Sequence, residues 1–172
     1  MIIIDAHLDL AYNAVNHGRN LRQSVSEIRA AENGRNPEGI ATVAIPDLLA
    51  GGVGVVFGTL FVTPASRRDI AGEPIYHNAQ QAHTLAMAQI DYYHRLADED
   101  ERVRLVGNRA ALAAVLQSHE QGERPSLGIV PLMEGADPIR EPEEAELWYE
   151  RGLRLIGLAW DDTRYADGAW RG

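Results

Sequence analysis

A histidine and two aspartates alternate near the start of the chain, in the run Asp5-Ala-His7-Leu-Asp9. In an extended strand, residues two apart point to the same side, so we expect these three side chains to line one face. An imidazole nitrogen and a carboxylate oxygen are ligands suited to zinc. His7 and Asp9 are therefore candidate ligands of one metal ion. The alternative is that the acidic side chains cap neighbouring loops.

A further carboxylate stands at the end of another apolar run, where Glu134 follows Leu127–Met133. A charged carboxylate at the tip of a buried strand is costly unless it is paired or coordinated. In parallel barrels the active-site residues lie at the carboxyl ends of the strands. We therefore expect His7, Asp9 and Glu134 to meet on one rim, as metal ligands. The alternative for Glu134 is a salt bridge to Arg140.

Short apolar runs predict the strands that must position these side chains. The runs are Ile2–Ile4, Val53–Val62 and Leu127–Met133, and weaker candidates are Val103–Val106 and Leu153–Ala159. The first three are bounded by Gly, Pro or acidic residues, as strands are. Their apolarity is continuous rather than alternating, which is typical of parallel strands covered by helices on both sides. We therefore expect about five parallel strands.

Helical patterns lie between these runs. Tyr76–Asp98 has apolar residues at steps of three and four, and Ser24 with Glu27 fits a capping box for a short helix through Ala31. Further helices are expected at Pro46–Ala50, Arg109–His119 and Pro142–Arg151. This alternation predicts an α/β fold with a parallel sheet, in a single domain over residues 1–172.

Two stretches between the expected elements are long enough to be functional loops. They are His17–Gly39, which is polar apart from its short helix, and Thr63–Glu73.

The composition excludes several classes of protein. The 172 residues carry 25 acidic and 16 basic side chains, for a formal charge of -9, and contain no Cys. A disulfide-stapled protein is therefore excluded, and the acidic balance argues against a nucleic-acid partner. No apolar run reaches the roughly 18 residues that span a bilayer. Because Met1 leads into an apolar and acidic start without a basic region, we expect no signal peptide and a cytoplasmic location.

Other motifs favour structural interpretations. Gly52-Val-Gly54 opens a strand rather than a helix, so it does not match a dinucleotide-binding loop. His119-Glu120 begins like a zincin motif, but Gly122 interrupts the helix that would hold a second ligand. His83 and His94 are separated by about 16 Å of helix rise, too far to share an ion. We interpret all three histidines as packing or surface residues.

Several segments together resemble the membrane dipeptidase (renal dipeptidase) family of zinc peptidases, peptidase family M19. They are the runs DAHLD at Asp5–Asp9, IPDLLAGGVGVVF at Ile45–Phe57, LMEGA at Leu132–Ala136 and GLRLIGLAWDDTRYADG at Gly152–Gly168. They fall in the family's order, and HxD in the first strand separates the chain from most amidohydrolase-type barrels.

The resemblance implies a (β/α)₈ TIM barrel of metal-dependent hydrolase type with two zinc ions. His7 and Asp9 would hold the first zinc, and Glu134 would bridge both. The family's other zinc ligands and its catalytic residues lie further along, so they are expected beyond Gly172. A complete barrel typically needs about 250 residues. We therefore expect an N-terminal portion of the barrel that binds at most one zinc and is inactive alone.

The resemblance also implies a substrate class, small dipeptides including L,D-dipeptides. Trp160 stands where well-known members have a His that contacts the bound peptide, so it is a candidate substrate-binding residue whose effect on preference is open. The alternative for Trp160 is a packing residue at the barrel rim.

Two other functions stay open. One is a different metal-dependent, amidohydrolase-like barrel that acts on cyclic amides or esters. The other is a non-catalytic half-barrel that serves as a binding or structural module. We expect a homo-oligomer, because a half-barrel exposes sheet edges that ought to be covered.

Overall fold

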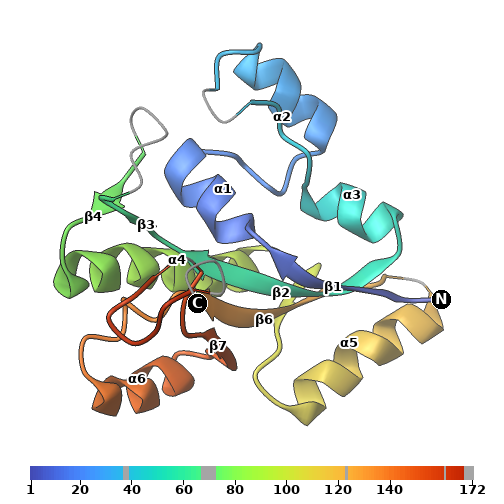
Figure 1. Ribbon diagram of the computed structural model, residues 1–172. Helices are drawn as coiled ribbons and strands as arrows, with labels where there is room; N and C mark the ends of the chain where they lie inside the picture. Colours follow the sequence, from blue (N-terminus) through green and yellow to red (C-terminus); the bar gives the residue numbers. More distant parts are fainter. Residues whose placement is uncertain (37–38, 67–72, 123, 161, 169–172) are drawn as a thin grey trace.

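The computed structural model describes residues 1–36, 39–66, 73–122, 124–160 and 162–168. A parallel sheet runs through its middle, with β1 (Ile3–Leu8), β2 (Val53–Phe61) and β6 (Leu127–Glu134) side by side (Figure 1). The other edge of β6 pairs first with β5 (Val103–Leu105) and then with β7 (Leu155–Gly157). The predicted α/β fold with a parallel sheet of about five strands is confirmed.

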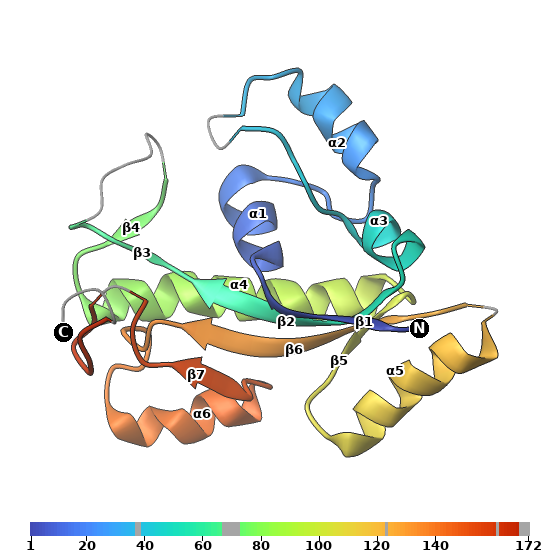
Figure 2. The same ribbon diagram turned by 45° about the vertical axis from the view of Figure 1, so that its right-hand side comes forward.

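Helices surround this sheet. They are α1 (Leu10–His17), α2 (Val25–Glu32), α3 (Ile45–Ala50), α4 (Ala79–Glu99), α5 (Arg109–Gln121) and α6 (Ala145–Glu150), which continues the 3₁₀ turn η1 (Pro142–Glu144). Figure 1 shows α1, α2 and α3 above the sheet and α5 and α6 below it. In Figure 2, α4 runs along the sheet, and the arrowheads of β2, β6 and β7 point the same way. The carboxyl ends of these strands therefore gather at one rim.

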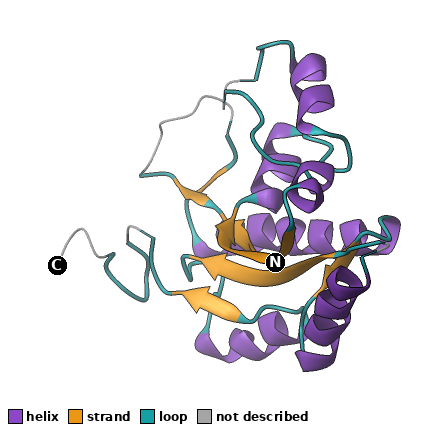
Figure 3. Cartoon of the chain, turned by 90° about the vertical axis from the view of Figure 1, so that its right-hand side faces the viewer, coloured by secondary structure: helices purple, strands orange, loops and turns teal. Residues whose placement is uncertain are grey.

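Apolar side chains cover both faces of β2 and β6, as the continuous apolar runs predict. The first run was also expected to be covered, but Ile3 and Ile4 of β1 are 43% and 57% exposed, because β1 lies at an edge of the sheet. The larger core contains residues of the helices α1, α2, α3, α4 and α6 and of the strands β2 and β6. The α4 residues Ile90 and Tyr93 are fully buried in it. A smaller cluster under α5 consists of Val55, Val106, Val115 and Val130. Figure 3 shows the helices on both sides of the strands. This two-sided covering holds the strand ends, and the side chains on them, in fixed positions.

The start of the chain differs from the expectation. The first strand extends to Leu8, and the helix α1 follows directly, in a segment for which the sequence pattern predicted no helix. The expected loop from His17 is also more ordered than its polarity indicates. Arg19 is buried there, and its guanidinium donates to Glu32 at 2.7 Å and to the Gly39 carbonyl at 2.9 Å.

The capping box is confirmed, because the Glu27 amide donates to Ser24 Oγ and the Ser24 amide donates to the Glu27 carboxylate. In the second expected loop, β3 (Thr63–Pro64) pairs in parallel with β4 (Ile75–Tyr76). Residues 67–72 of that loop lie outside the described residues.

Among the described residues, no helix combines the length and the apolarity that a membrane crossing requires.

Candidate metal centre

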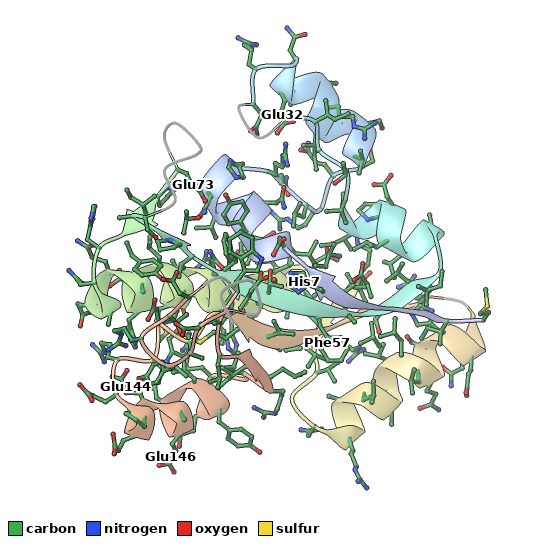
Figure 4. The ribbon with its side chains drawn as sticks, viewed as in Figure 1. His7, Glu32, Phe57, Glu73, Glu144 and Glu146 are labelled. Atoms are coloured by element: carbon green, nitrogen blue, oxygen red, sulfur yellow. The ribbon has the colours of Figure 1, made fainter. Side chains whose placement is uncertain are left out.

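Three predicted side chains converge at the carboxyl ends of β1 and β6. His7 Nε2 lies 3.2 Å from Glu134 Oε2 and 3.9 Å from Asp9 Oδ1. One ligand atom from each residue lies within 4.8 Å of the other two. Figure 4 shows His7 over the sheet, where β1 leads towards α1. The prediction that these three residues meet on one side of the sheet therefore agrees with the geometry.

Asp5 does not join this group, contrary to the expected alternation. Between Asp5 and Leu8 the register with β2 slips, since three steps along β1 match two steps from Val56 to Gly58. Such a bulge re-aims the side chains that follow it. Asp5 Oδ1 instead accepts a hydrogen bond of 3.0 Å from the His7 amide. Asp5 therefore supports the strand end, and His7 is the residue of this pair whose side chain faces Asp9 and Glu134.

Asp9 occupies the N-cap position of α1, yet its side chain makes no capping hydrogen bond. Its carboxylate oxygen Oδ1 accepts a hydrogen bond from the hydroxyl of Thr59, a fully buried residue of β2. The alternative in which Asp9 caps the neighbouring segment is therefore wrong. The carboxylate faces β2, His7 and Glu134 instead of its own helix.

Glu134 ends β6 opposite Phe61 of β2, and its side chain is only 16% exposed. Burial raises the pKa of the Glu134 carboxyl; the adjacent His7 opposes this shift and the charge of Asp9 adds to it. The alternative salt bridge to Arg140 is wrong, because the Arg140 guanidinium donates to Glu144, with its Nε 2.8 Å from Oε1. Glu134 is thus a largely buried carboxylate, and His7 Nε2 lies 3.2 Å from it.

The donor set fits a divalent ion in chemistry, and the two separations from His7 Nε2 are close to those of zinc ligands. Ligands at about 2.0–2.2 Å from a tetrahedral zinc stand roughly 3.3–3.6 Å apart. The separations of 3.2 and 3.9 Å from His7 Nε2 bracket this range. A cation would also offset the cost of holding the carboxylates of Asp9 and Glu134 close together.

Trp160 lies next to this group on the same rim. Trp160 is 42% exposed as a residue, and its ring packs edge-on against Phe61, with the ring centroids 5.7 Å apart. Trp160, Phe61 and Glu134 line one cleft. The expected contact with substrate and the expected packing at the rim are therefore both compatible with its position.

The histidines interpreted as packing residues have backbone partners elsewhere. His83 Nδ1 lies 3.0 Å from the Pro138 carbonyl, and His94 Nε2 lies 2.8 Å from the Arg151 carbonyl. His119 Nε2 lies 2.9 Å from the Ser126 carbonyl. These contacts tie helices α4 and α5 to other segments, as expected of packing residues, and His119 is half-buried rather than solvated at the helix end.

Two residues near the site were missed from the sequence, Thr59 and Phe61. Both point to the same side of β2 as alternate residues of one strand. A single hydroxyl residue inside the otherwise apolar run VGVVFGTLF was the available signal for Thr59. Phe61 gave no signal, because an aromatic residue at a strand end is ordinary core composition.

The sequence is similar to that of a known protein family over its whole length. A family model described as membrane dipeptidase (peptidase family M19) matches residues 1–172. A protein of Acinetobacter calcoaceticus, described as an uncharacterized protein in the PQQ-III 3′ region, is 30% identical over 91 residues. That match covers 52% of this chain and 27% of the Acinetobacter protein.

Solved structures share the fold. The metallopeptidase dipeptidase AC of family M19 has a TM-score of 0.60 at 20% identity, over 93% of this chain and 43% of that one. A Rhodobacter sphaeroides metallopeptidase, liganded with a phosphinate mimic of the dipeptide L-Ala-D-Ala, has a TM-score of 0.65 at 19% identity. That match covers 95% of this chain and 46% of the Rhodobacter chain. The probable dipeptidase PvdM of Pseudomonas aeruginosa has a TM-score of 0.68 at 12% identity. That match covers 94% of this chain and 35% of the Pseudomonas chain.

The chain thus spans less than half the length of these three structures, and its sheet is part of a (β/α)₈ barrel of the metallo-dipeptidase type. Since the family model matches all of residues 1–172, the chain belongs to the membrane dipeptidase family, peptidase family M19.

Proposed function

We propose that this chain carries the first metal site of a zinc-dependent dipeptidase. The observation that supports it most is the convergence of His7, Asp9 and Glu134 from the ends of two separate strands. Membership of a family of metallopeptidases supports the same proposal. In it, His7, Asp9 and Glu134 would hold one zinc ion, and the Glu134 carboxylate would also be available to a second.

Each side chain has a defined task in this proposal. His7 offers Nε2 as a neutral nitrogen ligand, and Asp9 offers a carboxylate whose orientation is set by Thr59. Glu134 places a negative charge in a largely buried position, where its attraction for a cation is screened less than at the surface. A zinc ion held here supplies Lewis-acid polarisation of the scissile carbonyl and activates water at neutral pH.

We further propose that Trp160 and Phe61 contact an apolar side chain of the dipeptide. The rings of Trp160 and Phe61 lie beside Glu134 in the same cleft, and we call these two residues the aromatic wall. Aromatic faces bury apolar groups well and offer no charge to pair with an acidic or basic side chain. The proposed substrates are therefore small dipeptides with an apolar residue, including L,D-dipeptides.

Metal binding is tested with variants of this chain, residues 1–172. Zinc content after dialysis is compared in the wild type, His7→Ala and Glu134→Gln, with Glu146→Gln as the matched control. Glu146 is an exposed residue of α6 (Figure 4). We expect both site variants to lose zinc and to bind it at least about tenfold more weakly, while the control keeps wild-type content. Unchanged zinc content in both site variants would contradict the proposal.

Substrate preference is tested with Trp160→Ala in a protein in which further barrel strands follow residues 1–172. We expect kcat/KM for a Leu-containing dipeptide to fall about tenfold relative to an Asp-containing dipeptide of similar size. The control is Tyr149→Ala, which removes an exposed aromatic ring on α6 and should leave the ratio unchanged. The panel contains L,L- and L,D-dipeptides, and also a cyclic amide. Turnover of the cyclic amide alone would assign the protein to a different hydrolase reaction.

A further inference from the structure

The carboxylate of Asp9 accepts a hydrogen bond from Thr59, which is not itself one of the three proposed metal ligands. Thr59 is fully buried in β2, and its hydroxyl donates to Asp9 Oδ1. The Leu8 carbonyl lies farther from the same hydroxyl, at 3.5 Å. A hydroxyl has one hydrogen to donate, and here it is directed at the carboxylate. Because a carboxylate oxygen has two lone pairs, this bond leaves Asp9 able to bind a cation.

A second buried hydroxyl, that of Tyr93, connects the two segments that carry Asp9 and Thr59. The Tyr93 phenol donates to the Thr59 carbonyl at 2.9 Å and accepts from the Ala11 amide at 3.2 Å. Ala11 lies in the first turn of α1, where amides have no partner within the helix. Burial raises the pKa of the Tyr93 phenol, so the group stays neutral and keeps its hydrogen.

This arrangement explains why Asp9 is free to face the site. An Asp at an N-cap position normally accepts a hydrogen bond from the second or third amide of its helix. In α1 the Ala11 amide is satisfied by Tyr93, a residue of α4, and the Asp9 side chain makes no capping bond. Tyr93 thus takes over the capping role, and the carboxylate turns towards Thr59 and His7.

Gly58 provides the space for the Tyr93 phenol. A Cβ at Gly58 would lie 2.8 Å from both Cζ and Oη of Tyr93, and 2.8 Å from a methyl group of Ile129. Contacts under 3.0 Å are not tolerated by real Cβ atoms, and the ring is fully buried. The glycine next to Thr59 therefore lets the phenol reach between β2 and α1.

We infer that Thr59 and Tyr93 are positioning residues of the metal site: Tyr93 caps α1 in place of Asp9, and Thr59 orients the carboxylate thereby released. This inference rests on the proposed role of Asp9 as a metal ligand. It adds that the affinity of the site for a metal depends on two hydroxyls that do not touch the ion. Residues that orient metal ligands typically change metal affinity by 10- to 100-fold when they are removed.

The test measures the zinc affinity of this chain, residues 1–172, by competition with a chromophoric chelator. Thr59→Val removes the hydroxyl at nearly constant volume, and we expect it to weaken zinc binding at least about tenfold. Thr59→Ser restores the hydroxyl and should recover affinity to within about threefold of the wild type. Tyr93→Phe removes one oxygen and should weaken binding in the same direction, whereas Tyr92→Phe on the same helix should not.

Two outcomes separate this inference from the proposed function. If Thr59→Val binds zinc as tightly as the wild type while His7→Ala does not bind it, the positioning role is wrong and the metal site stands. If His7→Ala and Glu134→Gln also keep full affinity, the metal site itself is wrong. Should Tyr93→Phe fail to fold, the Thr59→Val and Thr59→Ser pair still decides. Zinc affinity that falls in a folded Thr59→Val and recovers in Thr59→Ser supports the positioning role, and zinc affinity that is the same in all three proteins overturns it.

Discussion

At the scale of single residues, the site combines groups that are costly to hold together. Glu134 is largely buried, and the Asp9 carboxylate lies close to it, with His7 between them. Such an arrangement lowers the stability of a protein unless a ligand offsets it, and functional sites commonly carry this cost. The same features that favour a cation in this position should therefore be measurable as a stability defect in the metal-free protein.

We expect Glu134→Gln to stabilise the metal-free protein at neutral pH. Burial raises the pKa of Glu134 above its usual 4.5, with His7 opposing the shift and Asp9 adding to it. The protonated carboxyl therefore favours the folded state below the usual pKa, and this contribution is lost as the pH rises through the raised value. The variant should gain about 1 kcal/mol in free energy of unfolding near pH 7.

The gain should shrink as the pH falls towards 4, because Glu134 is then protonated in both states. Urea denaturation of the metal-free protein at several pH values measures it, and Glu146→Gln serves as the exposed control, with a change within about 0.5 kcal/mol. A loss of stability in Glu134→Gln at neutral pH would show that its attraction to His7 outweighs its burial.

Residue types and spacing were enough to predict that His7, Asp9 and Glu134 converge, and their role as metal ligands stays a prediction. The reasons for the misses are local. His7, Asp9 and Glu134 carry strong chemistry at strand ends. Asp5 was wrongly expected beside them, because alternation assumes an unbroken strand and the bulge before Leu8 is not visible in the side-chain pattern. Thr59 was missed because its role depends on a partner 50 positions away.

At the scale of elements, the strands were predictable and the first helix was not. Continuous apolar runs identify β2 and β6 within one or two residues, since burial on both faces requires them. The helix α1 has only eight residues, and the amide of its first turn is satisfied by Tyr93, 82 positions away. The start signal in its own sequence, Asp9 at the N-cap position, was interpreted as a metal ligand instead.

We expect Gly58→Ala to destabilise the fold by about 1–3 kcal/mol, because the added methyl group would overlap the Tyr93 phenol and Ile129 in a packed core. The matched control is Gly157→Ala in β7, where the added Cβ would meet only the Met133 carbonyl at 3.7 Å. Urea denaturation of both variants gives the difference. Equal stability of the two would mean that α4 shifts to accommodate the methyl group at little cost.

At the scale of the whole molecule, the sheet has apolar residues at both of its edges. Among the described residues, β1 pairs with β2 alone and β7 with β6 alone. Ile3 and Ile4 of β1 are 43% and 57% exposed, and Leu155 and Ile156 of β7 are 39% and 41% exposed. Exposed apolar strands of this kind are the edges along which a sheet accepts further strands. The barrel architecture was predictable only from the family resemblance, since the apolar runs by themselves indicate a parallel sheet and no closure.

The last prediction concerns residues 1–172 taken by themselves. The described residues contain one group of converging metal ligands, with three members. A catalytic two-metal site needs ligands for a second ion and groups that orient the substrate, and the loss of positioned contacts costs orders of magnitude in rate. We therefore expect this chain alone to bind at most one zinc and to hydrolyse dipeptides at least about a hundredfold more slowly than a protein in which further barrel strands follow it.

Zinc content and turnover of L,L- and L,D-dipeptides are measured for both proteins, with Asp9→Asn in each. In the longer protein, Asp9→Asn should abolish turnover, because it removes a ligand that the other strands cannot replace. In residues 1–172 alone, the same change should leave the measured turnover at its already low level. Rapid turnover by the short chain that disappears in Asp9→Asn would mean that two copies combine their exposed sheet edges, β1 and β7, to complete one site.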